Sequence, residues 1–203
     1  MNFDSILLEK SLTALNDQLE IRRSPVIEIV VCGGSALQFL GLVDRTTKDV
    51  DILAFASSNN DFLNLVTARD LPEYLSDSIK IVSRDFKLPE NWFNSGPTDL
   101  LTQGLPAGLE DRLIYKKYGS CLTVYFISRY DQIFFKMYAS INGGGQRHLN
   151  DLIALNPSDE ELIAAARWCL TQDASEIFPH LVIDFLKKVG YKSVSERIKH
   201  EME

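Results

Sequence analysis

Residues 27–53 read IEIVVCGGSALQFLGLVDRTTKDVDIL, and this stretch indicates how the first part of the chain folds. Its opening, rich in isoleucine and valine, predicts a buried strand that ends at a turn formed by Gly33, Gly34 and Ser35. A short helix is expected after the turn, and a second strand is expected to begin at Asp49. The pattern of strand, glycine turn, helix and strand indicates an α/β unit.

Two groups of residues in this stretch suit a phosphorylated ligand. Glycines allow backbone N–H groups to approach an anion, and the first N–H groups of a helix are unpaired, so Gly33, Gly34 and Ser35 are predicted to bind phosphate. Residues two apart in a strand share a face, so Asp49 and Asp51 are expected to lie side by side. Paired carboxylates repel unless a cation lies between them, and Mg²⁺ beside substrate phosphates is such a cation. The alternative is an ordinary tight turn next to two aspartates on a solvated edge.

The composition is that of an ordinary globular protein with an acidic balance. The chain has 203 residues, of which 45% are hydrophobic and 24% are charged, and its net charge is −7. An acidic protein that acts on nucleic acid would need a local basic patch. The three cysteines suit a reducing compartment, and neither a membrane-spanning stretch nor a secretory signal is found, so a cytoplasmic protein with no membrane partner is expected.

Hydrophobic periodicity predicts a mixed sheet in the first two thirds of the chain and helices in the last third. Residues 57–60 are read as a loop or a helix cap and residues 62–66 as the start of a helix. Residues 112–118 and 122–127 are predicted to be paired strands. Helices are predicted at 5–21, 72–86, 128–138, 146–155, 160–170 and 178–189, and the charged terminal segment 191–203 is read as a helix or a tail. The expected organisation is an α/β core over residues 1–127 with a helical part, residues 128–203, packed on it.

Three charged residues of the helical part are further candidates for a site. Arg147 and Asp151 are four residues apart on one predicted helix, where an ordinary ion pair between them is one explanation. The other is that Lys136 binds a triphosphate as a point charge and that Arg147 binds phosphate through two hydrogen bonds. The residue types alone leave both explanations open.

Residues 26–168 resemble the nucleotidyltransferase superfamily, in which a hydrophobic strand, Gly-Gly or Gly-Ser and a later Asp-x-Asp recur. The resemblance is to the branch that includes AbiEii-type toxins and DUF6036-type proteins. It is carried by Arg45-Thr46-x-x-Asp49-Val50-Asp51, by a tryptophan-containing segment at 91–94, and by Ser128, Asp131, Lys136, Arg147 and Asp151. It implies an α/β (α+β) nucleotidyltransferase-like mixed-sheet core with a helical C-terminal part. It also implies Mg²⁺-dependent transfer of a nucleoside monophosphate from a nucleoside triphosphate to a hydroxyl, which in toxin relatives is on tRNA.

The resemblance also implies roles for individual residues. Asp49 and Asp51 would hold Mg²⁺ and act in catalysis together with Lys136 and Asp151. The nucleotide-binding set would be Gly33, Gly34, Ser35, Lys136 and Arg147, and a cognate antitoxin would be a partner. Many members carry a third carboxylate on a later strand, but residues 122–127 contain no acid, so Asp131 or Asp151 would have to substitute for it. Two alternatives stay open: a catalytically weakened binding or regulatory protein, and a nucleotidyltransferase that acts on a small molecule, which the net charge favours over an RNA acceptor.

Overall fold

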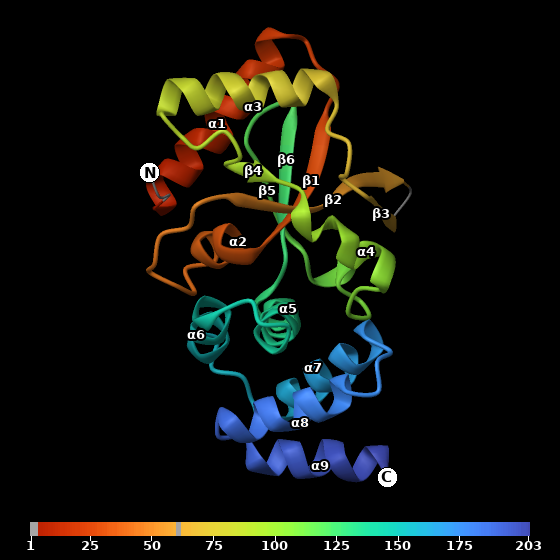
Figure 1. Ribbon diagram of the computed structural model, residues 1–203. Helices are drawn as coiled ribbons and strands as arrows, with labels where there is room; N and C mark the ends of the chain where they lie inside the picture. Colours follow the sequence, from red (N-terminus) through yellow and green to blue (C-terminus); the bar gives the residue numbers. More distant parts are fainter. Residues whose placement is uncertain (1–3, 60–61) are drawn as a thin grey trace. The chain divides into compact units, whose positions relative to one another are not determined.

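The computed structural model describes residues 4–59 and 62–203. Strand β1 (Ile27–Cys32), in the middle of the sheet, has one antiparallel and one parallel neighbour (Figure 1). The chain divides into two units, Met1–Ser128 and Arg129–Glu203. In the described residues, the first unit contains a six-stranded mixed sheet with flanking helices, and the second unit is helical. The predicted α+β fold class, with a mixed-sheet core and a helical C-terminal part, is therefore confirmed.

The sheet has the strand order β3-β2-β1-β6-β5, and the short strand β4 pairs with β2 outside this path. Strand β1 is antiparallel to β2 and parallel to β6. Strands β4 and β3 share one edge of β2, because β4 pairs with its beginning and β3 with its end. The beginning of β2 therefore has a strand on each side. The strands are β1 (Ile27–Cys32), β2 (Val50–Asn59), β3 (Phe62–Val66), β4 (Phe93–Asn94), β5 (Ile114–Lys117) and β6 (Leu122–Phe126).

The two long helices of the first unit pack on the sheet through regular apolar faces. Helix α1 (Ser5–Ile21) begins at Asp4, whose Oδ1 accepts a hydrogen bond from the Leu7 N–H at 2.7 Å. Its leucine face, Leu8, Leu12, Leu15 and Leu19, is buried. Helix α3 (Glu73–Phe86) lies beside α1 (Figure 1). The remaining helical segments are α2 (Gly33–Phe39), α4 (Asp99–Gln103) and two 3₁₀ turns, Gly96–Thr98 and Glu110–Arg112.

Two predictions for this unit were wrong. Residues 62–66 form strand β3, not the start of a helix, and pair with residues 55–59 of β2. Burial alternates in β3, with Leu63 and Leu65 half-buried and Asn64 and Val66 exposed, which is the period of a strand; a short apolar run cannot distinguish the two periods by itself. The predicted loop at 57–60 is also wrong for residues 57–59, which belong to β2, and residue 60 lies outside the described residues.

The second unit consists of helices close to those predicted. They pack around an aromatic cluster in which Trp168 contacts Phe134, Phe135 and Tyr138, and Tyr138 also contacts Phe178. Such ring pairs add to the stabilisation that comes from burial of apolar surface. The helices are α5 (Arg129–Ile141), α6 (Gln146–Ala154), α7 (Asp159–Gln172), α8 (Phe178–Lys188) and α9 (Lys192–Met202).

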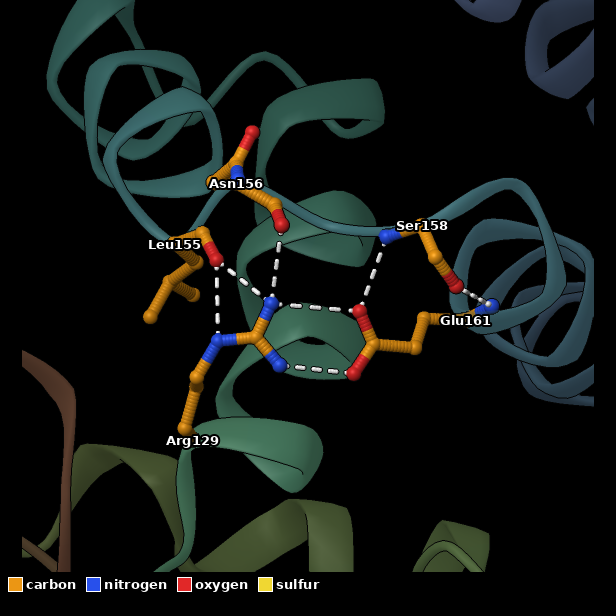
Figure 2. Close-up of polar contacts among 5 residues, drawn as sticks. All are labelled: Arg129, Leu155, Asn156, Ser158 and Glu161. Atoms are coloured by element: carbon orange, nitrogen blue, oxygen red, sulfur yellow. Dashed lines mark hydrogen bonds and ion pairs between the residues drawn. The ribbon is translucent and has the colours of Figure 1, made fainter.

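Arg129, the first residue of α5, ties the end of α6 to the beginning of α7 (Figure 2). Its guanidinium donates to the carbonyl oxygen of Leu155 from Nε at 2.9 Å and from Nη2 at 2.6 Å, and to that of Asn156 at 2.9 Å. It also forms a bidentate ion pair with Glu161, in which Nη1 lies 2.6 Å from Oε1 and Nη2 lies 3.1 Å from Oε2. Glu161 in turn accepts from the Ser158 N–H at 2.8 Å, which completes the capping box of α7. One arginine thus satisfies carbonyl groups left unpaired at the end of one helix and fixes the cap of the next.

Replacing Arg129 with methionine should lower the free energy of unfolding of the second unit and make that free energy depend less on pH in the acid range. The hydrogen bond from Arg129 lowers the pKa of the Glu161 carboxyl, against the opposing effect of its partial burial. A carboxyl with a lowered pKa stabilises the fold above its unfolded value of about 4.3, and that stability is lost as pH falls through the lower folded pKa. We expect Arg129→Met to cost about 1–3 kcal/mol at pH 7 and to show a smaller further loss than wild type between pH 5 and 3 in urea unfolding. Arg69→Met, which breaks an exposed pair with Asp99, is the control; equal losses in both variants would contradict the prediction.

Candidate functional site

The glycine turn and the aspartate motif meet where β1 passes into α2. The strand register pairs Cys32, the last residue of β1, with Asp51 of β2. Gly33 follows with a φ of +69°, a conformation that favours glycine. A Cβ at Gly33 would collide with Oδ2 of Asp51 and would lie 3.1 Å from its Cγ. Glycine is therefore needed here both for the backbone conformation and for the close approach of the Asp51 carboxylate.

The segment before β2 folds back over the second glycine. A Cβ at Gly34 would lie 2.6 Å from Oγ1 of Thr47 and 3.3 Å from Nη1 of Arg45. Gln38 of α2 holds this segment by donating to the Arg45 carbonyl oxygen at 2.8 Å. The guanidinium of Arg45 is thereby brought to the glycine turn. The sequence showed Arg45 only as part of a motif, because its return to Gly34 depends on the path of residues 41–47.

The two aspartates flank the beginning of β2. Asp49 is half-buried just before the strand, which begins at Val50, one residue later than predicted. Asp51 is half-buried and accepts a hydrogen bond from Nδ2 of Asn94 at 2.6 Å. Residues 4–59 and 62–203 contain no group of three or more histidine, cysteine, aspartate or glutamate residues that could hold a metal ion. A metal ion at this place would therefore be coordinated by two carboxylates and by oxygens of the substrate, which is a common arrangement for Mg²⁺.

Ser35, the third residue of the predicted phosphate-binding turn, has a fully buried side chain. Its hydroxyl donates to the carbonyl oxygen of Cys32 at 3.3 Å, and so links the start of α2 to the end of β1. This contact gives a structural reason for a serine at this position, because the hydroxyl stabilises the turn. The part of Ser35 in phosphate binding stays a prediction.

The candidates of the second unit lie on helices α5 and α6. Lys136 of α5 and Asp151 of α6 form an ion pair at 2.8 Å, with side chains that are only 5% and 1% exposed. Arg147 is exposed near the beginning of α6, and Asp131 is fully buried in the first turn of α5. Because Lys136 and Asp151 neutralise each other between two packed helices, this pair has a structural function whatever else it does. The catalytic and nucleotide-binding roles of these residues stay predictions.

Comparison with protein families assigns the chain to one of them. Residues 10–153 match the model of DUF6036, which is described as a nucleotidyltransferase of unknown function. The chain belongs to the DUF6036 family. Neither the comparison with curated proteins nor the comparison with solved structures gave a significant match.

The match to DUF6036 covers the glycine turn and both aspartates, and it continues through α5 to the last turn of α6. The resemblance to the nucleotidyltransferase superfamily is thereby confirmed. In the described part of this DUF6036 protein, no helix has the length and apolar character needed to cross a membrane.

Proposed function

We propose that this DUF6036 protein is a Mg²⁺-dependent nucleotidyltransferase that transfers a nucleoside monophosphate from a nucleoside triphosphate to an acceptor hydroxyl. The observation that carries the proposal is the carboxylate of Asp51 set against Gly33 at the end of β1, with Asp49 two residues earlier in the chain. Family membership supplies the class of reaction. The glycine turn brings the backbone at the end of β1 against the carboxylate of Asp51, so a phosphate bound at the turn would lie beside this acid.

The residues at the start of β2 fit a magnesium ion by their chemistry. Asp49 and Asp51 would provide carboxylate oxygens, which Mg²⁺ prefers, and the triphosphate would provide the others. When bound there, Mg²⁺ would offset charge on the phosphates and on the leaving pyrophosphate. The phosphates would lie at the turn of Gly33 and Gly34, beside the carboxylate of Asp51, and Arg45 would offset part of their charge from within the same unit. The proton of the acceptor hydroxyl would pass to an acid near the α-phosphate, for which Asp51 is the candidate beside the turn.

Two classes of acceptor fit this reaction. One is a hydroxyl of tRNA, with a cognate antitoxin as a protein partner, as the resemblance to AbiEii-type toxins implies. The other is a hydroxyl of a small molecule, which the net charge of −7 favours because phosphate-rich acceptors are repelled at long range. Incubation with each nucleoside triphosphate labelled at the α-phosphate, followed by separation of RNA from small molecules, distinguishes the two classes by where the label goes.

A second candidate function is nucleotide binding without transfer, in a regulatory protein. The observation in its favour is that, over the described ranges, no acidic group of three accompanies Asp49 and Asp51. Pyrophosphate release separates the two functions, because a binding protein would bind the nucleotide and release none.

The acid pair is tested by changing Asp49 and Asp51 together to asparagine. In wild type, Mg²⁺ and a nucleoside triphosphate at about 100 times its Kd should stabilise the fold by about 2.7 kcal/mol, or raise the Tm by about 5–10 °C. In the double variant the rise in Tm and the release of pyrophosphate should both disappear, because the metal loses its charged ligands. Asp99→Asn, at an exposed acid of the same unit, should respond as wild type does. An unchanged rise in Tm in the double variant would place the nucleotide elsewhere.

A further inference from the structure

Asn94 faces Asp51 from a neighbouring strand that the sequence did not predict. Strand β4 contains only two residues, and its register pairs Asn94 with Asp51. Nδ2 of Asn94 donates to Oδ1 of Asp51 at 2.6 Å, and Oδ1 of Asn94 accepts from the Gly96 N–H at 2.7 Å. A backbone N–H can only donate and a carboxylate can only accept, so a single orientation of the amide satisfies both contacts. The side chain of Asn94 is therefore held in one orientation, with its donor toward Asp51.

The backbone of Asn94 is anchored from outside the sheet as well. Trp92, two residues earlier, is fully buried and donates from Nε1 to the carbonyl oxygen of Ile79 in α3 at 3.1 Å. The carbonyl oxygen of Trp92 accepts from the Val50 N–H at 2.6 Å, next to Asp51. The segment that presents Asn94 is thus tied both to α3 and to the first residue of β2. A rigid support of this kind is what a side chain needs in order to orient another.

We infer that Asn94 is a positioning residue for Asp51, an inference that rests on the proposed function and concerns the same site. Its amide donates to the Asp51 carboxylate and so holds one of the two carboxylate oxygens in place. Because the amide is neutral, it does so without placing a positive charge that would compete with the metal ion. It also fixes the direction in which the carboxylate lies beside Gly33.

Two variants separate this role from a purely structural one. Asn94→Asp has the same shape and keeps an oxygen for the Gly96 N–H, but it replaces the donor to Asp51 with a second carboxylate. Asn94→Ala removes both contacts. If Asn94 only holds the turn at residues 94–96, Asn94→Asp behaves as wild type. If Asn94 positions Asp51, Asn94→Asp brings two carboxylates face to face.

The first measurement uses neither metal nor nucleotide, so it stands even if the proposed function fails. Like charges in contact hold the folded pKa of an acid above its unfolded value of about 3.9, so the stability is present below that value and is lost as pH rises through the folded pKa. Between pH 4 and pH 7 the Tm of Asn94→Asp should therefore fall by about 5 °C relative to Asn94→Ala. Mg²⁺ should restore part of this loss at pH 7. Parallel pH profiles for the two variants would overturn the inference.

The second measurement compares the steady-state rates of pyrophosphate release. A misplaced Asp51 should lower kcat of Asn94→Ala by about 10- to 100-fold, with KM for the nucleoside triphosphate within about twofold of wild type. A change in KM alone, with kcat kept, would overturn the inference. Wild type that releases no pyrophosphate with any nucleoside triphosphate would refute the proposed function instead, and the metal-free pH profile would then decide whether Asn94 holds Asp51.

Discussion

Lys136→Ala is expected to lower the free energy of unfolding by about 3–5 kcal/mol, because it removes the counter-charge of an almost fully buried carboxylate. A charge that is 1% exposed cannot be compensated by water as a surface charge is. Urea unfolding of the full chain measures the loss. The fluorescence of Trp168, which lies in the same unit, reports the unfolding, and Trp92 is replaced by phenylalanine in all variants so that Trp168 is the only fluorescent tryptophan. A loss below about 1 kcal/mol would show that the pair contributes little to the fold.

A double variant separates the ion pair from the space that it fills. Lys136→Met together with Asp151→Leu replaces both charges with apolar groups of similar volume, and it should recover stability to within about 1 kcal/mol of wild type. Lys199→Ala, at an exposed lysine of α9, is the control for loss of a surface charge and should change stability by less than about 0.5 kcal/mol. If the double variant is as unstable as Lys136→Ala, the loss comes from packing and not from the unpaired charge.

The same double variant tests the predicted role of Lys136 in nucleotide binding, since its fold is expected to be intact. If Lys136 contacts the triphosphate, the affinity for a non-hydrolysable analogue should fall by about 10- to 100-fold, the effect of losing a charge-assisted contact. Isothermal titration of wild type and the double variant measures this directly. Equal affinities would remove Lys136 from the nucleotide site and leave it as a buried structural lysine.

Gly33→Ala is expected to lower the rate of pyrophosphate release by about 100-fold or more, because its new methyl group must displace the carboxylate of Asp51. A non-glycine residue at a φ of +69° also strains the backbone, at a cost of about 1–3 kcal/mol. Pyrophosphate release and urea unfolding of the same preparation give the two effects separately.

Gly41→Ala is a matched control for the strain at Gly33. Gly41 has a φ of +66°, and a Cβ placed there would meet no atom of the described residues within 4 Å. It should therefore lose similar stability but keep its activity within a few-fold of wild type. Combining Gly33→Ala with Asp51→Ala should produce no further loss of activity beyond that of Asp51→Ala, because the two changes act on the same carboxylate. Equal activity of the two glycine variants would contradict the placement of Asp51.

Those parts of the fold that depend on neighbouring residues could be predicted from the sequence alone. The leucine face and the Asp4 cap of α1 follow from a repeat of 3.6 residues and from one hydrogen bond across three residues. The run from β1 through the turn at Gly33 into α2 has an equally local cause, namely a β-branched strand followed by glycine. The two acids of the aspartate motif were recognised for the same reason, because their spacing of two residues needs no distant information. Asp49 lies just before β2, and a site shared by the two acids stays a prediction.

The contacts that those residues make became known from the tertiary structure. Strand β3 was misread because five residues hold too little of either period, and its pairing with β2 settles its conformation. The hydrogen bond from Asn94 to Asp51 joins residues 43 apart, and β4 is too short to show a pattern. Lys136 looked like a surface or ligand-binding lysine until α6 brought Asp151 to it. In the last two cases a partner distant in the sequence supplies the contact, and nothing in the local pattern identifies that partner.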